Sequence, residues 1–140
     1  MLKEIKWEDE FLIGNKEIDH LHKELLERIN LCIRGANGHL GDIKIDQLML
    51  GLFRYTKWHF KIEESLMEIH EYPEKKSHLE EHTDLLNMLE EEIKKFQTTK
   101  THFQEITSFF SGWFGAHTLD SDKKMADYLN DMSQNEFAIN

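Results

Sequence analysis

The sequence predicts an all-α fold: an up-down-up-down antiparallel four-helix bundle with an N-terminal arm and a short C-terminal helix. Three observations lead to this prediction. The chain contains a single proline, its apolar residues recur at helical rather than alternating spacing, and three turn-forming stretches divide it into long amphipathic segments. Long segments joined by short connections are typical of antiparallel bundles. The length of 140 residues suits one domain, so residues 1–140 are expected to form a single domain.

The positions of the breaks define each element in turn. The breaks are GANGHLGD at 35–42, EYPEKK at 71–76 and QTTKTH at 97–102. Glycine, proline and clusters of small polar residues of this kind end helices and form turns. The expected elements are an arm over 1–16, helices over about 17–36, 44–70, 74–96 and 102–118, and a short terminal helix over about 122–132.

Composition excludes several classes of function. The chain has 17 basic against 27 acidic side chains and a formal net charge of −10, so it lacks the basic patches that nucleic acids and anionic membranes require. No apolar run approaches the length of a membrane span, and the N-terminus lacks the apolar core of a signal peptide. The single Cys32 cannot form an internal disulfide. These features predict a cytoplasmic protein without a nucleic-acid or membrane partner, and they leave any protein partner undefined.

Histidine is abundant, with nine residues in the chain. Histidine is the usual ligand of iron, zinc or copper when thiolates are scarce. The inward positions of the expected helices, spaced by three and four residues, include at least one histidine in every helix. These histidines are His22, His59, His78, His82 and His117. Because neighbouring helices run antiparallel, all five are expected to converge at one end of the bundle.

Two of the expected helices carry pairs that can chelate an ion. His59 and Glu63 are four residues apart, and so are His78 and His82, which places each pair within about 40° around the helix axis. An isolated pair of this kind is more often a surface feature or a core histidine with an ordinary partner. Five histidines and a carboxylate buried together, however, need a common partner, and a metal ion satisfies them best.

The stretch HTLDSD, from His117 to Asp122, adds a further candidate ligand. Residues five apart lie about 140° around an ideal helix, so these two side chains can share a site only if the helix breaks or loosens between them. The intervening TLDS is a suitable place for such a change. Asp122 is therefore included in the candidate site.

Several stretches of the sequence resemble the hemerythrin family, specifically its bacterial single-domain members. They are IKWEDEFLIGNKEIDHLH at 5–22, His59 with Glu63, YPEKKSHLEEH at 72–82 and WFGAHTLDSD at 113–122. The motifs His, HxxxE, HxxxH and HxxxxD follow one another in that order, and the resemblance covers nearly the whole chain. In this family two irons lie inside a four-helix bundle and bind O2 reversibly. The resemblance implies the same fold and the same function here.

The resemblance also implies a set of ligands. One iron would take His78, His82 and His117, and the other His22 and His59, with Glu63, Asp122 and an oxo or hydroxo group bridging them. Two carboxylates and a hydroxide across two Fe²⁺ leave a core charge of about +1, which an apolar bundle tolerates. Three histidines and three bridges saturate one octahedral iron, whereas two histidines leave an open position on the other. O2 would bind there, with NO or other small anions as further candidate ligands. The histidines without a counterpart as ligands are His20, His39, His70 and His102, interpreted as surface or loop residues.

Side chains beside the open position are expected to be apolar, because they must exclude water. The candidates for this O2 pocket are Ile18, Leu25, Trp113, Phe114 and Thr118. Two of them depart from the family pattern. Phe114 stands where leucine is common, and Thr118 stands where an aliphatic residue is usual, so the size and dryness of the pocket are the properties they affect.

Sensing modules, di-iron oxidases and zinc hydrolases are the alternatives to a reversible O2 binder. A sensing module, in which O2, NO or the redox state shifts a partner surface, would use the same ligands and is the main alternative. Di-iron oxidases usually need two Glu-x-x-His motifs and two further glutamates, whereas this chain has one such motif, Glu17 with His20. A zinc hydrolase would use an HExxH motif, which is absent. The sequence therefore predicts a non-enzymatic O2 binder for carriage, storage or delivery.

Overall fold

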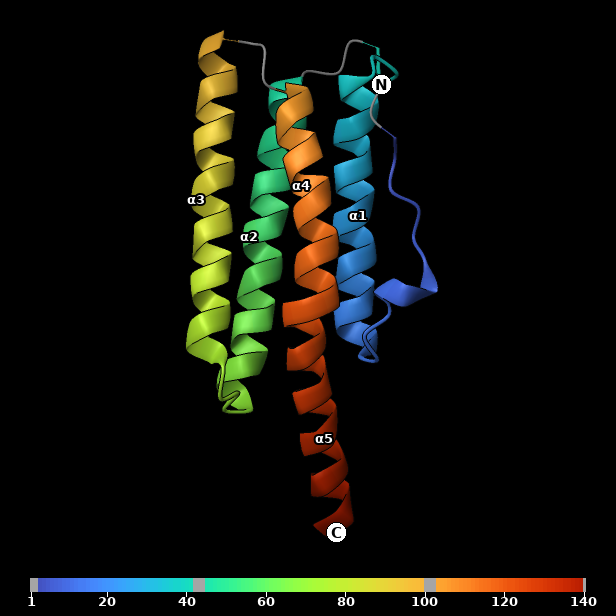
Figure 1. Ribbon diagram of the computed structural model, residues 1–140, viewed down its shortest axis with the longest axis vertical. Helices are drawn as coiled ribbons and strands as arrows, with labels where there is room; N and C mark the ends of the chain where they lie inside the picture. The colour runs from blue at the N-terminus through green and yellow to red at the C-terminus, as the bar shows by residue number, and fades with distance from the viewer. Residues whose placement is uncertain (1–2, 42–44, 100–102, 140) are drawn as a thin grey trace.

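The regular structure of the chain is helical. The structure, a computed structural model, describes residues 3–41, 45–99 and 103–139, and no strand occurs within these ranges. Its elements are the 3₁₀ helix η1 (Asp9–Phe11), α1 (Lys16–Ala36), α2 (Ile45–Ile69), α3 (Lys75–Thr99), α4 (Phe103–His117), the π-helical turn η2 (Thr118–Asp122) and α5 (Lys123–Ile139). Helices α1 to α4 alternate in direction along one axis (Figure 1). This arrangement confirms the predicted all-α four-helix bundle.

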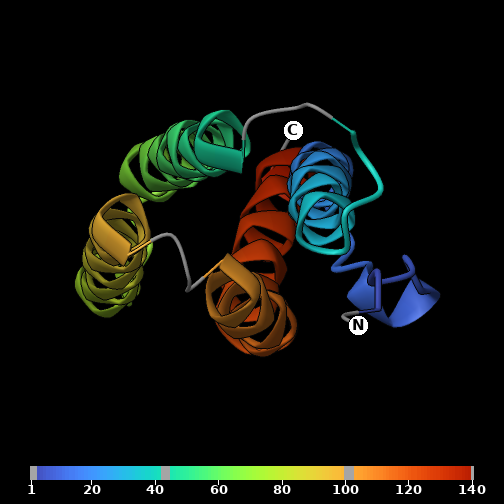
Figure 2. The ribbon, with the colours of Figure 1, turned by 90° about the horizontal axis from the view of Figure 1, so that it is seen from above.

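Seen along the axis, α1 to α4 follow one another around the bundle in chain order (Figure 2). Helix α5 continues the line of α4 and extends beyond the other helices (Figure 1). It runs past the predicted end at 132, and no loop precedes it because the π-helical turn joins it directly to α4. The predicted break at 97–102 begins inside α3, and residues 100–102 lie outside the described ranges. None of the described helices has the length and apolar character that a membrane span requires.

Local capping interactions explain where α1 begins and where α1 and α2 end. The Asn15 side chain accepts hydrogen bonds from the second and third backbone N–H groups of α1, which satisfies donors that have no partner within the helix. At the other end Gly38 has φ of 78°, and the His39 N–H donates to the Arg34 carbonyl at 2.9 Å. Helix α2 ends in the same way, with Glu71 at φ of 52°.

Two apolar clusters lie above and below a polar layer inside the bundle. The large cluster includes Leu25, Ile29, Leu52, Leu85 and Phe114. The small cluster consists of Ile13, Ile18, Met67, Tyr72, Met125, Ala126 and Leu129. On α1 the buried His22 lies between Ile18 of the small cluster and Leu25 of the large one. The histidines therefore meet at one level, as expected, but that level is not the end of the bundle, because the arm and the first turns of α5 cover it.

The N-terminal arm is attached to α1 at two places. Near its start, the Asn30 amide forms two hydrogen bonds with the Ile5 backbone, one to its N–H and one to its carbonyl, both at 2.8 Å. Near its end, the Ile13 N–H donates to the Asp19 carboxylate at 2.9 Å. Between these points the buried Phe11 packs edge-on against Phe114 of α4, with ring centroids 5.6 Å apart. The arm is thus part of the packed structure.

The two attachments predict separable effects on the arm. Replacing Asn30 by alanine (Asn30→Ala) removes both hydrogen bonds to Ile5 and should lower the free energy of unfolding by about 1–2 kcal/mol. Hydrogen exchange followed by NMR should show faster exchange of the Ile5 amide and unchanged exchange of the Ile13 amide. The matched control Asp19→Ala should give the reverse pattern. Unchanged protection of Ile5 in Asn30→Ala would contradict this assignment.

Candidate metal centre

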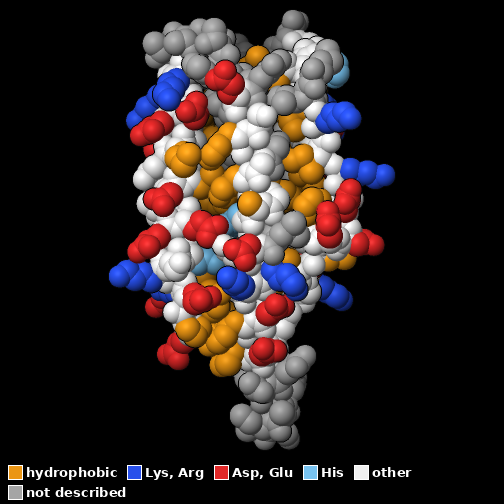
Figure 3. Space-filling model, in the orientation of Figure 1, with side chains coloured by type: hydrophobic (Ala, Val, Ile, Leu, Met, Phe, Trp, Pro, Cys, Tyr) orange, Lys and Arg blue, Asp and Glu red, His pale blue; other side chains and the backbone are white. Residues whose placement is uncertain are grey.

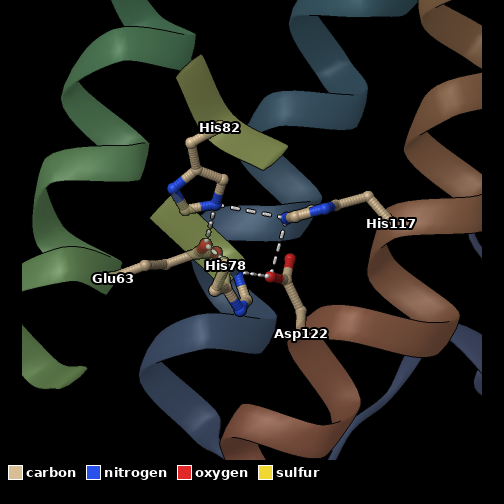
Figure 4. Close-up of side chains that lie close together, drawn as sticks. All are labelled: Glu63, His78, His82, His117 and Asp122. Atoms are coloured by element: carbon tan, nitrogen blue, oxygen red, sulfur yellow. Dashed lines mark hydrogen bonds and ion pairs between the residues drawn. The ribbon is translucent and has the colours of Figure 1, made fainter. Parts of the chain in front are cut away.

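Seven buried polar side chains from all four helices of the bundle and the π-helical turn point toward one another. They are His22 from α1, His59 and Glu63 from α2, His78 and His82 from α3, His117 from α4 and Asp122 from the turn η2. Figure 4 shows five of them, with His78, His82 and His117 meeting around the carboxylates of Glu63 and Asp122. These are the seven residues that the sequence analysis selected as candidate ligands. The structure brings all of them into one site.

The first group of donors contains three histidines. His82 Nε2 lies 3.1 Å and His78 Nε2 lies 3.7 Å from Glu63 Oε1. Asp122 Oδ1 lies 3.0 Å from His78 Nε2 and 2.9 Å from His117 Nε2. One donor atom from each of these five residues lies within 4.8 Å of the others. A single ion could contact all of them.

The second group contains two histidines and uses the other oxygen of each carboxylate. Glu63 Oε2 lies 2.8 Å from His59 Nε2 and 3.5 Å from His22 Nε2. Asp122 Oδ2 lies 2.7 Å from His22 Nε2. Each carboxylate therefore directs one oxygen to the three-histidine group and one to the two-histidine group. This is the arrangement needed to bridge two neighbouring ions.

The donor set fits divalent metal ions better than it fits a purely protein network. Glu63 Oε1, Asp122 Oδ1 and His78 Nε2 are buried and, apart from the close contacts between nitrogen and oxygen given above, form no hydrogen bond with the described residues. Buried polar atoms in native structures are almost always partnered, and atoms left without a partner destabilise the fold. Imidazole nitrogens and carboxylate oxygens are suitable ligands for ions such as iron. Bound cations would satisfy all three atoms.

A π-helical turn brings Asp122 onto the same side of the helix as His117. The turn covers Thr118–Asp122, and the backbone is α-helical on both sides of it. Because a π-helix pairs residues five apart, it overcomes the offset of about 140° that separates these positions in an α-helix. The α-helix loosens between His117 and Asp122, where the sequence predicted a change. The side chain of Thr118, a predicted pocket residue, lies outside what the structure describes.

Carboxylates behind two of the rings were not predicted. Glu64 lies 2.9 Å from His82 Nδ1, and Glu81 lies 2.5 Å from His117 Nδ1. The second oxygen of Glu81 accepts a hydrogen bond from Ser121 Oγ at 2.6 Å. The sequence feature that could have identified them is adjacency: Glu64 directly follows a predicted ligand, and Glu81 directly precedes one. These contacts fix the orientation of both rings.

Solvent reaches the outer edge of the three-histidine group. A polar pocket of about 190 Å³ is lined by residues that include His78, Glu81 and Ser121. On the face of the molecule shown in Figure 3, histidine atoms are visible in the middle of the bundle with acidic and basic side chains beside them, and the lining of the pocket includes Glu74, Glu81 and Asp120. This side of the centre is therefore close to solvent and to negative charge.

Apolar side chains lie beside the two-histidine group. Phe114 is buried and meets His22 edge-on, with ring centroids 6.1 Å apart. Ile18 and Leu25, one turn before and one turn after His22 on α1, are also buried. These three predicted pocket residues are thus placed next to one of the two histidines of the smaller group.

Trp113 lies beside the other group. Its ring stacks on His117, with centroids 4.5 Å apart and planes at 15°, and meets Phe60 edge-on at 5.5 Å. Phe60, which the sequence analysis did not select, stacks on His82 with centroids 3.7 Å apart. Trp113 therefore contacts a three-histidine ligand, whereas the O2 pocket was expected next to the two-histidine iron.

Without metal, the rings and carboxylates of the centre form ion pairs. Burial lowers the pKa of His22 and His78, but the close contacts with the Asp122 and Glu63 carboxylates outweigh burial and raise both pKa values to about 9. The pKa of His117 is raised to about 10, because the charge of Asp122 and the bonds to Asp122 and Glu81 outweigh burial. The hydrogen bond from His117 lowers the pKa of Glu81 to about 2. Metal ions must displace these protons to bind.

Three other histidines that the structure describes are separate from the centre. His20 and His39 are exposed, and His70 is partly exposed at the end of α2. His102 lies outside the described residues. The exposed pair supplies control positions for substitutions at the centre.

The raised histidine pKa values predict how the stability of the metal-free protein depends on pH. Folded-state pKa values of about 9 to 10 lie above the unfolded value of about 6.5. The resulting stabilisation is complete below about pH 6.5 and is lost as the pH rises through about 9 to 10. The melting temperature of the metal-free protein, followed by circular dichroism, should therefore fall between about pH 7 and pH 10. Metal-loaded protein should show a smaller fall, and equal falls in the two forms would contradict this explanation.

Comparisons with known proteins agree with the geometry of the site. The family described as Hemerythrin HHE cation binding domain matches residues 14–129. Bacteriohemerythrin of Stenotrophomonas maltophilia is 27% identical over 132 residues, which are 94% of this chain and 85% of that protein. The bacteriohemerythrins of Pseudomonas paraeruginosa and Clostridium acetobutylicum are 29% and 28% identical, and the matches cover 86% of this chain and 78% and 98% of those proteins. The family match spans most of the bundle and all seven converging residues, so this chain belongs to the hemerythrin family.

Proposed function

We propose that this protein binds O2 reversibly at two non-haem irons inside the bundle, for carriage, storage or delivery. The observation that carries the proposal is the presence of two adjacent donor groups of unequal size that share Glu63 and Asp122. His78, His82 and His117 would hold one iron, and His22 and His59 would hold the other. Glu63, Asp122 and an oxo or hydroxo group would bridge them.

The unequal groups support a role in binding a small ligand. The three-histidine group and the shared carboxylates would offer five protein ligands to one iron, whereas the two-histidine group would offer four to the other and so leave it one ligand short. Iron held there would supply the redox chemistry for reversible binding of O2. The open position is also suited to NO and small anions.

The protein surroundings of the two-histidine group favour reversible binding. Phe114, Ile18 and Leu25 are buried around His22, so they exclude the water and protons that promote irreversible oxidation of a ferrous centre. Di-iron oxidases in helical bundles usually use four glutamates, whereas the donor groups here contain two carboxylates and five histidines. This composition supports non-enzymatic binding.

An O2-, NO- or redox-sensing function at the same centre is the second candidate. The specific observation in its favour is a row of aromatic contacts from His22 to Phe114 and from Phe114 to Phe11 in the arm. A change at the two-histidine iron would reach the N-terminal arm through this row. Measuring hydrogen exchange in the arm with and without O2 distinguishes the candidates, because a sensor requires the exchange rates to change.

Metal analysis and optical spectra test the proposed centre. Protein produced with iron should contain about two iron ions per chain, and its spectrum should change reversibly with O2. Glu63→Ala should lose both ions because both donor groups share this residue, and His59→Ala should lose the O2-dependent spectrum. His39→Ala, which changes an exposed histidine, should retain both properties. Stoichiometric zinc without iron, or a normal spectrum in His59→Ala, would refute the proposal.

Substitution of Phe114 tests the apolar wall. Phe114→Ala should admit water beside His22 and should accelerate the irreversible loss of the oxygenated spectrum by about tenfold or more. The matched control Ile93→Ala opens a cavity in the large cluster on α3, away from the centre, and should leave this rate unchanged. Stopped-flow mixing with O2 measures the rate at which the oxygenated spectrum is lost in both variants. Equal rates in Phe114→Ala and the parent protein would remove Phe114 from the pocket.

A further inference from the structure

The two donor groups differ in what lies behind their histidine rings. In the three-histidine group, His82 and His117 direct Nε2 to the centre and Nδ1 to a carboxylate, Glu64 or Glu81. The Glu81 carboxylate is itself held by the Ser121 hydroxyl. Two of the three rings in this group are therefore supported from outside.

The two-histidine group lacks this support. His22 and His59 also direct Nε2 toward the shared carboxylates. Their Nδ1 atoms are buried and form no hydrogen bond with any residue that the structure describes. The two rings stack on each other with centroids 5.1 Å apart, a contact that does not select the protonated nitrogen.

A carboxylate behind a ring changes how that ring binds a metal. A carboxylate can only accept a hydrogen bond, so Nδ1 of His82 and of His117 must carry the proton. The lone pair of Nε2 is then directed to the metal, the ring cannot rotate freely, and the donor becomes more basic. Loss of such a partner typically reduces metal affinity by about 10- to 100-fold.

We propose that Glu64 and Glu81 are positioning residues that rank the two metal positions, so that the three-histidine position fills first and empties last. The two-histidine position, to which the proposed function assigns O2, is then the exchangeable one. The inference rests on the proposed two-metal centre. It adds a role for the π-helical turn, which provides the ligand Asp122 and, through Ser121, also supports Glu81.

Cobalt(II) titration of the metal-free protein under argon tests the ranking without O2 or iron. Calorimetry and the cobalt absorption bands should show two binding steps. Glu64→Gln and Glu81→Gln should each weaken the first step by about 10- to 100-fold and leave the second step unchanged. Ser121→Ala should weaken the same step by a smaller factor. Glutamine can still accept the Nδ1 hydrogen bond, so these changes remove charge while keeping the shape of the side chain.

The neighbouring Glu80→Gln is the matched control. It makes the same change in charge on an exposed side chain of α3 and should leave both steps as in the parent protein. Circular dichroism of each metal-free variant establishes that it is folded. If Glu81→Gln does not fold, Glu64→Gln tests the same step through a different ring.

Three results would overturn the ranking: two equal steps in the parent protein, weakening of the second step by Glu64→Gln or Glu81→Gln, or a single cobalt ion per chain. The proposed O2 binding is measured separately, on iron-loaded protein. Ordered cobalt binding without an O2-dependent iron spectrum would refute O2 binding and keep the ranking. Reversible O2 binding by the iron-loaded protein together with two equal cobalt-binding steps would support O2 binding and refute the ranking.

Discussion

Two carboxylates with almost no exposure to solvent impose the main constraint on this structure. Glu63 is 0% exposed and Asp122 is 1% exposed. A charge buried this deeply destabilises the fold unless opposite charge or hydrogen-bond donors surround it. Imidazoles from four helices surround both carboxylates, and metal ions would reinforce the same contacts. The antiparallel directions of the helices, the level of each histidine and the π-helical turn are all consistent with this single requirement.

Helical spacing predicted the bundle and six of the seven converging residues, and Asp122 was included on the condition that the helix loosens after His117. The pair His59 and Glu63 lies on one face of a helix wherever that helix is placed, so its geometry is local. Convergence of the five histidines followed from the alternating direction of the helices. The spacing between His117 and Asp122 conflicted with an ideal helix, and the conflict marked the place where the backbone is π-helical. A departure from regular spacing was thus as informative as the regular pattern.

The contacts that the sequence did not predict depend on the rotation of one helix against another. Trp113 is the exception: it was expected beside the two-histidine iron, but its ring stacks on His117, four residues further along the same helix, which is a local contact. Glu64 and Glu81 resemble ordinary surface glutamates in the sequence, and only the packing of α2, α3 and α4 brings each of them to a ring. The small apolar cluster combines the arm with α5, two segments that are far apart in the chain. Local periodicity contains no information about such pairs.

The continuous helix formed by α4, the π-helical turn and α5 gives the centre a mechanical connection to the end of the chain. Asp122 lies within this rod, with α4 inside the bundle on one side and α5 projecting beyond the bundle on the other (Figure 1). A rotation of α5 about the rod axis would turn the Asp122 carboxylate away from His22 of α1 and His78 of α3. Occupied metal positions would resist that rotation, because the ligands of the centre belong to three neighbouring helices as well. The orientation of the projecting helix would then be coupled to the occupancy of the centre.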